Sequence, residues 1–186
     1  LYAKANYALE FGGIKPVISD TNEIHLKKIY HPLLVQSRGK KNVVPLSIDF
    51  LDNKRGYLIS GPNAGGKTVA LKSIGLNILL ALSGFFPLGE VHTNFRNIYS
   101  AIGDHQSIEN DLSTFSSQLI KLKQILDIAD SKSLILIDEI GSGTDPQEGG
   151  ALASGILDTF VEIKLFFIAT THQSSLKTYA LNREVI

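Results

Sequence analysis

Residues 61–68 read Gly-Pro-Asn-Ala-Gly-Gly-Lys-Thr and match the pattern G-x-x-x-x-G-K-[ST] at every fixed position. Such a loop must follow a strand and open a helix, because its backbone N–H groups have to point at a bound phosphate. The apolar run Tyr57–Ser60 precedes it, and residues 69–82 read as a helix. With glycine near 7% of residues, a chance match occurs about once in a hundred chains of this length. A plain Gly-rich turn is therefore the weaker interpretation.

Each part of this loop has a chemical role. Gly61, Gly65 and Gly66 let the backbone turn tightly around phosphate oxygens. Lys67 brings a positive charge to the β- and γ-phosphates, and Thr68 offers a hydroxyl to Mg²⁺. ATP and Mg²⁺ are thus the predicted cofactors. The predicted nucleotide-binding residues on this segment are Gly61, Pro62, Asn63, Ala64, Gly65, Gly66, Lys67, Thr68 and Val69.

Composition limits the class of protein. The 186 residues are 44% hydrophobic, which suffices for one packed domain. Eighteen basic residues balance eighteen acidic ones, so the strongly basic surface typical of a main nucleic-acid contact is missing. Without cysteine there is no disulfide and no Cys-based metal site. We find no membrane-spanning run and no signal peptide, and expect a soluble cytoplasmic protein. The absence of methionine and the abrupt ends suggest a fragment of a larger protein.

Hydrophobic periodicity predicts alternating strands and helices. Strand patterns cover residues 23–29, 43–50, 57–60, 97–102, 133–137 and 165–170. Helix patterns cover residues 1–10, 69–82, 113–129 and 149–160, and residues 37–42 read as a polar loop. This order predicts an α/β fold in which helices flank one largely parallel sheet.

Two carboxylates follow a buried strand. Residues 134–137 are apolar, and Asp138 and Glu139 come directly after them. Ligands bind at the carboxyl ends of the strands in open α/β sheets, so both side chains are expected at the site. Asp138 is suited to hold Mg²⁺ through its water shell, and Glu139 to deprotonate the attacking water. Alone this pattern is weak, but it follows Thr68 by 70 residues, which makes it strong evidence.

Two further segments belong to the predicted site. His172 ends the next apolar strand, where an imidazole can donate a hydrogen bond to a γ-phosphate. The alternative is a surface histidine in a loop. Residues 141–146 are too rich in glycine for a helix and lie close to the carboxylates, although a plain connecting loop is also possible.

Four motifs in order resemble the ATPase domain of MutS proteins, which are ABC-type ATPases. They are GPNAGGKT at 61–68, LSTFSSQL at 112–119, LILIDEIGSGTDPQEG at 134–149 and ATTH at 169–172. Residues 103–108, 144–149 and 176–180 look most like the MutS-two (endonuclease MutS-like) branch. The resemblance covers residues 3–183. It implies a P-loop NTPase of ABC-ATPase type, with a mixed, mostly parallel sheet flanked by helices.

The resemblance also implies a domain organisation and a composite site. Residues 1–22 would be a helical stub leading in from a missing lever or core region, and residues 23–186 a C-terminally truncated ATPase domain. Lys67, Asp138, Glu139 and His172 would come from one subunit of a homodimer, and Ser113 from its partner. Ser113 could equally be the N-cap of its helix. Residues 141–145 would lie at the dimer interface, and residues 43–45 near the adenine.

The predicted function is Mg²⁺-dependent hydrolysis of ATP to ADP and phosphate, coupled to closure of the dimer. The resemblance implies DNA (branched or mismatched) or stalled ribosomes as targets, bound through missing regions, with any nuclease outside this segment. One alternative is the ATPase domain of a mismatch-repair MutS protein. An ABC transporter subunit is disfavoured, because no Leu-Ser-Gly-Gly-Gln signature is present. A non-catalytic nucleotide-gated module is disfavoured because it would not need Glu139.

Overall fold

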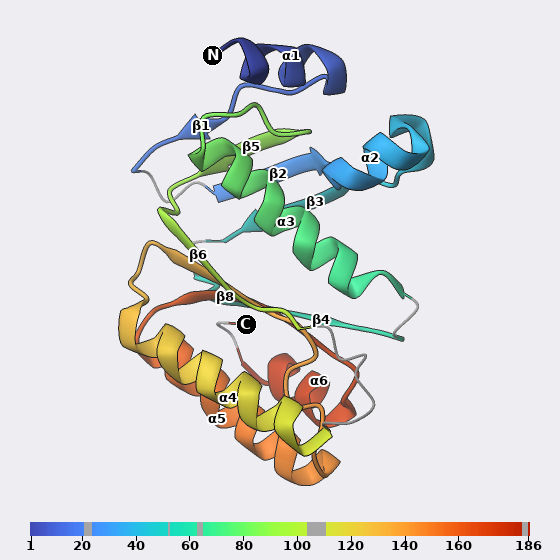
Figure 1. Ribbon diagram of the computed structural model, residues 1–186. Helices are drawn as coiled ribbons and strands as arrows, with labels where there is room; N and C mark the ends of the chain where they lie inside the picture. The colour runs from blue at the N-terminus through green and yellow to red at the C-terminus, as the bar shows by residue number, and fades with distance from the viewer. Residues whose placement is uncertain (21–23, 52, 63–64, 104–110, 184–185) are drawn as a thin grey trace. The chain divides into compact units, whose positions relative to one another are not determined.

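The computed structural model describes residues 1–20, 24–51, 53–62, 65–103, 111–183 and 186, with only the backbone of 111–114 (Figure 1). These residues form two compact units that alternate along the chain. The first comprises Leu1–Asp52 and Thr68–Arg96, and the second comprises Asn53–Lys67 and Asn97–Ile186. Each unit is built around its own four-stranded sheet.

The sheet of the first unit is mostly antiparallel. Its strand order is β1-β5-β2-β3. The strands are β1 (Val17–Ile18), β5 (Glu90–Thr93), β2 (Ile24–Ile29) and β3 (Leu46–Phe50). Strand β2 runs antiparallel to both β3 and β5, whereas β1 and β5 are parallel. Along β2, Ile24 and Leu26 are buried and Lys27 is exposed, as expected of a strand with one face in the core.

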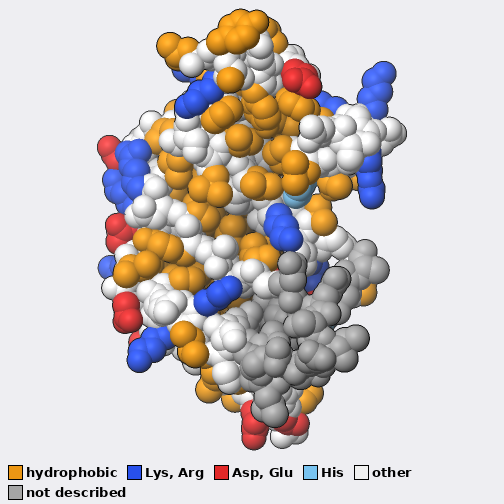
Figure 2. Space-filling model, in the orientation of Figure 1, with side chains coloured by type: hydrophobic (Ala, Val, Ile, Leu, Met, Phe, Trp, Pro, Cys, Tyr) orange, Lys and Arg blue, Asp and Glu red, His pale blue; other side chains and the backbone are white. Residues whose placement is uncertain are grey.

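Helices α1 (Tyr2–Phe11), α2 (Pro32–Arg38) and most of α3 (Lys67–Leu82), with the 3₁₀ turn η1 (Lys40–Asn42), complete this unit. Helix α1 buries none of its residues. Apolar side chains cover much of it, at the top of Figure 2. The most exposed apolar side chains in and next to this helix include Leu1, Tyr2 and Leu9. It is attached through Tyr7, whose ring meets Phe85 edge-on at 5.6 Å between centroids. Among the described residues, no helix is both long and apolar enough to cross a membrane.

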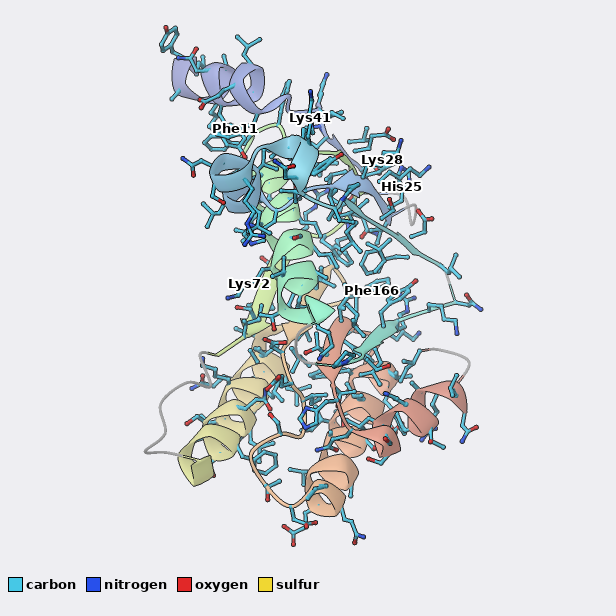
Figure 3. The ribbon with its side chains drawn as sticks, turned by 90° about the vertical axis from the view of Figure 1, so that its right-hand side faces the viewer. Phe11, His25, Lys28, Lys41, Lys72 and Phe166 are labelled. Carbon is cyan, nitrogen blue, oxygen red and sulfur yellow. The ribbon has the colours of Figure 1, made fainter. Side chains whose placement is uncertain are left out.

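The sheet of the second unit is entirely parallel, in the order β4-β8-β7-β6. The strands are β4 (Gly56–Ser60), β8 (Phe166–Thr171), β7 (Ser133–Ile137) and β6 (Asn97–Ala101). Every residue of β7 and β8 is buried, which explains their continuous apolar sequence. One hydrophobic cluster joins this sheet to helices α4 (Asp111–Ile128), α5 (Pro146–Glu162) and α6 (Ser174–Leu181), which lie on the same face (Figures 1 and 3).

The predicted α/β class and the parallel sheet flanked by helices are confirmed. The expectation of one sheet is wrong, because the first unit has a second, mostly antiparallel sheet. Helix α4 begins at Asp111, before the predicted start at residue 113. Helix α5 begins at Pro146, before the predicted start at 149, because the Asp145 side chain accepts hydrogen bonds from the first N–H groups. Elements β1, α2, β5 and α6 were not predicted.

Asn77 joins three parts of the first unit and gives a test of its packing. Its side-chain Nδ2 donates to the carbonyls of Tyr30 (2.9 Å) and Ser73 (2.8 Å), and its Oδ1 accepts from the Leu88 N–H (2.9 Å). Asn77→Ala leaves buried backbone groups unpaired, and we expect a loss of about 2–3 kcal/mol of unfolding free energy in urea titrations. Asn182→Ala, at an exposed position, should change it by less than about 0.5 kcal/mol. Equal effects of the two changes would contradict the role assigned to Asn77.

Candidate functional site

Three adjacent strand ends bring the predicted site segments to one edge of the parallel sheet. Strand β4 leads into the phosphate loop, β7 into Asp138 and Glu139, and β8 into His172. Because β8 lies between β4 and β7, and all three are parallel, these segments leave the same edge. Neighbouring strands lie about 4.8 Å apart, so the loop and the carboxylates begin roughly 10 Å from each other. That gap suits a triphosphate with its metal ion.

The phosphate loop folds around its own lysine. Lys67 is 6% exposed, and its Nζ donates to the carbonyls of Gly61 at 2.7 Å and Pro62 at 3.0 Å. Gly66 has a φ of 77°, and a Cβ at Gly61 or Gly66 would meet no atom within 4 Å. The ammonium is therefore buried against the loop's own carbonyls, and at Gly61 and Gly66 no atom occupies the space that a side chain would take. Asn63 and Ala64 lie outside the described residues.

Thr68 and Val69 occupy the first turn of α3, directly after Lys67. The backbone N–H groups of a first helical turn have no partner within the helix and favour an anion. Both predicted residues thus lie at a helix N-terminus, as the motif requires.

Asp138 is buried, with 3% of its surface exposed, and is held at three points. Its Oδ1 accepts from the Thr170 hydroxyl at 2.6 Å, and its carbonyl accepts from Nε2 of Gln118 at 2.8 Å. Its N–H donates to the Ala101 carbonyl at 3.2 Å, which extends the ladder with β6. Such contacts fix the direction of a carboxylate at the sheet edge.

Glu139 is half-buried and has a φ of 49°, in the left-handed region. Its N–H donates to the Thr170 hydroxyl oxygen at 2.8 Å, and its carbonyl accepts from the Ser142 hydroxyl at 2.6 Å. The chain therefore turns sharply after Asp138, and the backbone at Glu139 does not continue strand β7.

The donor set fits magnesium bound together with a nucleotide. No group of three or more His, Asp or Glu side chains able to hold a metal occurs in the described part of the chain. Mg²⁺ usually takes one or two protein ligands and completes its shell with phosphate and water oxygens. Asp138, buried at the end of β7, can supply one such oxygen ligand.

His172 is exposed and follows the last residue of β8. The next residue, Gln173, is buried, and its Nε2 donates to the Gly141 carbonyl at 2.6 Å. The turn after Glu139 is thus attached to the segment that carries His172. The supporting residues Gln118, Thr170 and Gln173 could not be predicted, because nothing in their spacing distinguishes them from other buried polar residues.

Ser113 and residues 43–45 are the predicted positions that have not yet been described. Ser113 is the third residue of α4 rather than its N-cap, and its side chain lies outside the described residues. Residues 43–45 precede β3, and Val44 is 90% exposed. His31, which was not predicted as a site residue, precedes Pro32, the first residue of α2. Burial, and secondarily the charge of Lys72 on α3 (Figure 3), lowers the pKa of His31.

Comparison with known proteins identifies the family. MutS domain V matches residues 57–185, a range that includes the phosphate loop, Ser113, both carboxylates and His172. The chain belongs to the MutS family. It is 46% identical over 187 residues to Endonuclease MutS2 of Staphylococcus aureus strain bovine RF122 / ET3-1, covering 99% of this chain and 23% of the relative. Another Staphylococcus aureus Endonuclease MutS2 is also 46% identical over 99% of this chain, which corresponds to 26% of that relative. The chain thus spans about a quarter of the length of these MutS-family relatives.

The close approach of two glycines positions the turn after Glu139. A Cβ at Gly149 on α5 would lie 2.2 Å from the Gly141 carbonyl oxygen, whereas a Cβ at Gly155 on the same helix would meet nothing within 4 Å. Gly149→Ala should therefore displace the turn and destabilise the protein by about 1–3 kcal/mol in urea unfolding. Gly155→Ala should stabilise it by about 0.5–1 kcal/mol, since alanine favours helix. Similar effects at both positions would show that the contact with Gly141 does not matter.

Proposed function

We propose that this chain is the ATPase domain of a MutS-type protein that hydrolyses ATP to ADP and phosphate with Mg²⁺. The observation that carries the proposal is the common edge of the parallel sheet, where the phosphate loop with its buried Lys67 and the carboxylates Asp138 and Glu139 emerge. We assign residues 23–186 to this domain and residues 1–22 to a lead-in segment. The identity to Endonuclease MutS2 supports the MutS-two branch.

In the proposed mechanism, the loop N–H groups and Lys67 bind the β- and γ-phosphates and keep the chain of phosphates in line for attack. Thr68 and Asp138 would hold Mg²⁺, which would neutralise charge on the phosphate oxygens. Glu139 takes a proton from the attacking water, whose oxygen bonds to the γ-phosphorus as the bond to ADP breaks. His172, exposed at the end of β8, donates to a γ-phosphate oxygen.

We further propose that two copies complete each site. Ser113 near the start of α4 would contact the γ-phosphate bound to the partner subunit, with the helix N-terminus adding partial positive charge. Residues 141–145 would lie at this interface. ATP binding would then close the dimer and hydrolysis would reopen it, because the γ-phosphate is the group that both subunits share.

The target is proposed to be branched DNA, such as recombination intermediates, or alternatively stalled ribosomes, engaged in the cytoplasm by parts of the protein outside these residues. The balanced charge of the chain supports placing the target contacts in other parts of the protein, since the chain has eighteen basic and eighteen acidic residues. The match to MutS domain V, rather than to a transporter family, disfavours the transport alternative. Any nuclease activity is assigned outside this segment.

Glu139→Gln separates binding from hydrolysis and tests the proposed activity. The amide cannot accept the proton of the attacking water, so phosphate release should fall by about 100-fold or more. Binding of a fluorescent ATP analogue should remain, and the dimer should persist with ATP in light scattering. Lys67→Ala is the matched variant that should lose binding itself. Normal turnover by Glu139→Gln would exclude Glu139 as the base.

A mixing experiment tests the composite site. Ser113→Ala and Lys67→Ala subunits should each be nearly inactive alone, while a mixed dimer contains one intact site. An equal mixture should therefore recover about a quarter of wild-type ATP hydrolysis, if subunits exchange randomly in a two-fold symmetric dimer. Mixing two Lys67→Ala preparations, one of them tagged, controls for the effect of exchange alone. If no activity returns despite exchange, the two residues do not act across the interface.

A further inference from the structure

The regular hydrogen-bonding pattern between β7 and β8 ends just before Asp138 and Glu139. The regular register ends at Ile137, which pairs with Ala169. One residue further, Thr170 contacts three consecutive residues. Its carbonyl accepts from the Ile140 N–H at 2.9 Å, its hydroxyl oxygen accepts from the Glu139 N–H at 2.8 Å, and its hydroxyl donates to Oδ1 of Asp138 at 2.6 Å.

The proton count of this hydroxyl makes the arrangement directional. A threonine hydroxyl has one proton to donate and lone pairs to accept with. Because the Glu139 N–H can only donate, the hydroxyl proton is directed to Asp138. Thr170 is fully buried, so water does not compete for either bond. The hydroxyl therefore selects which oxygen of Asp138 faces the sheet and fixes the rotation of the carboxylate.

The same hydroxyl supports an unfavourable backbone conformation. At a φ of 49°, Glu139 has the left-handed geometry that is unfavourable for residues with a Cβ. The bond from its N–H to Thr170 and the bond from the Ser142 hydroxyl to its carbonyl hold both sides of this residue. The direction of the Glu139 side chain thus depends on these two contacts.

We propose that Thr170 is the positioning residue that aligns both carboxylates, Asp138 toward Mg²⁺ and Glu139 toward the attacking water. The inference rests on the proposed ATPase function. Thr170 acts only through its neighbours, since its hydroxyl is committed to Asp138 and to the Glu139 N–H.

The test compares three variants of the full-length protein. Thr170→Val removes the hydroxyl with little change in shape, Thr170→Ser keeps it, and Thr93→Val removes a buried threonine hydroxyl that accepts from the Phe95 N–H in the other unit. The readouts are kcat and the Mg²⁺ concentration that half-saturates binding of a fluorescent, non-hydrolysable ATP analogue. Binding of the same analogue without Mg²⁺ is the internal reference.

For Thr170→Val we expect kcat to fall about 10- to 100-fold and the half-saturating Mg²⁺ concentration to rise about tenfold, as for other groups that orient a metal ligand. Binding without Mg²⁺ should be unchanged, and Thr170→Ser should restore both values to within about threefold of wild type. Thr93→Val should match wild type throughout.

A folded Thr170→Val protein with wild-type Mg²⁺ dependence and kcat would overturn the assignment. An equal defect in Thr93→Val would also overturn it, because the defect would then follow from the loss of any buried threonine hydroxyl. If the valine variant does not fold, as judged by thermal melting, the pair Thr170→Ala and Thr170→Ser decides by the same readouts. A wild-type protein that neither binds Mg²⁺-ATP nor hydrolyses it would instead reject the proposed function.

Discussion

Parallel pairing of β4, β8 and β7 is the constraint on which the site depends. The register places Ser60 beside Thr171 and Ile137 beside Ala169, so the three strands end at nearly the same level. Strands β7 and β8 are buried along their whole length, which makes them mostly apolar and leaves most of their polar residues at the strand ends. The segregation of the predicted nucleotide-binding groups to one edge therefore follows from burial of the strands.

Small residues then allow the elements behind this edge to pack closely. A Cβ at Gly56 would overlap the Phe167 ring at 2.1 Å, so only glycine lets β4 start against β8 at this point. The same holds where the Gly141 carbonyl meets Gly149 of α5. Asp145 caps α5 through the N–H groups of its first turn, which starts the helix immediately after the turn. The loop that follows Glu139 is thus short and closely packed.

The sequence alone was sufficient to predict those parts of the fold in which function or burial produces a local residue pattern. The phosphate loop, the buried strands β7 and β8 and the long helices were all readable from spacing and composition. The two-residue strand β1 and the four-residue strand β5 are defined by partners distant in sequence, so no local signal marks them. For the same reason a second sheet could not be separated from the first. The order of motifs predicts which segments form the site, whereas the contacts of Thr170 and Gln118 are seen only in the three-dimensional structure.

Buried polar groups at this edge are better explained by positioning than by stability. Gln173 is 9% exposed, and its Oε1 has no hydrogen-bond partner among the described residues. Leaving such an atom unpaired costs about 1–3 kcal/mol of folding free energy. Its Nε2 nevertheless holds the Gly141 carbonyl, and Gln118 holds the Asp138 carbonyl in the same way. Apolar residues would stabilise the core at these positions but would leave the carbonyls of the turn unpaired, so the polar side chains serve the geometry of Asp138 and Glu139.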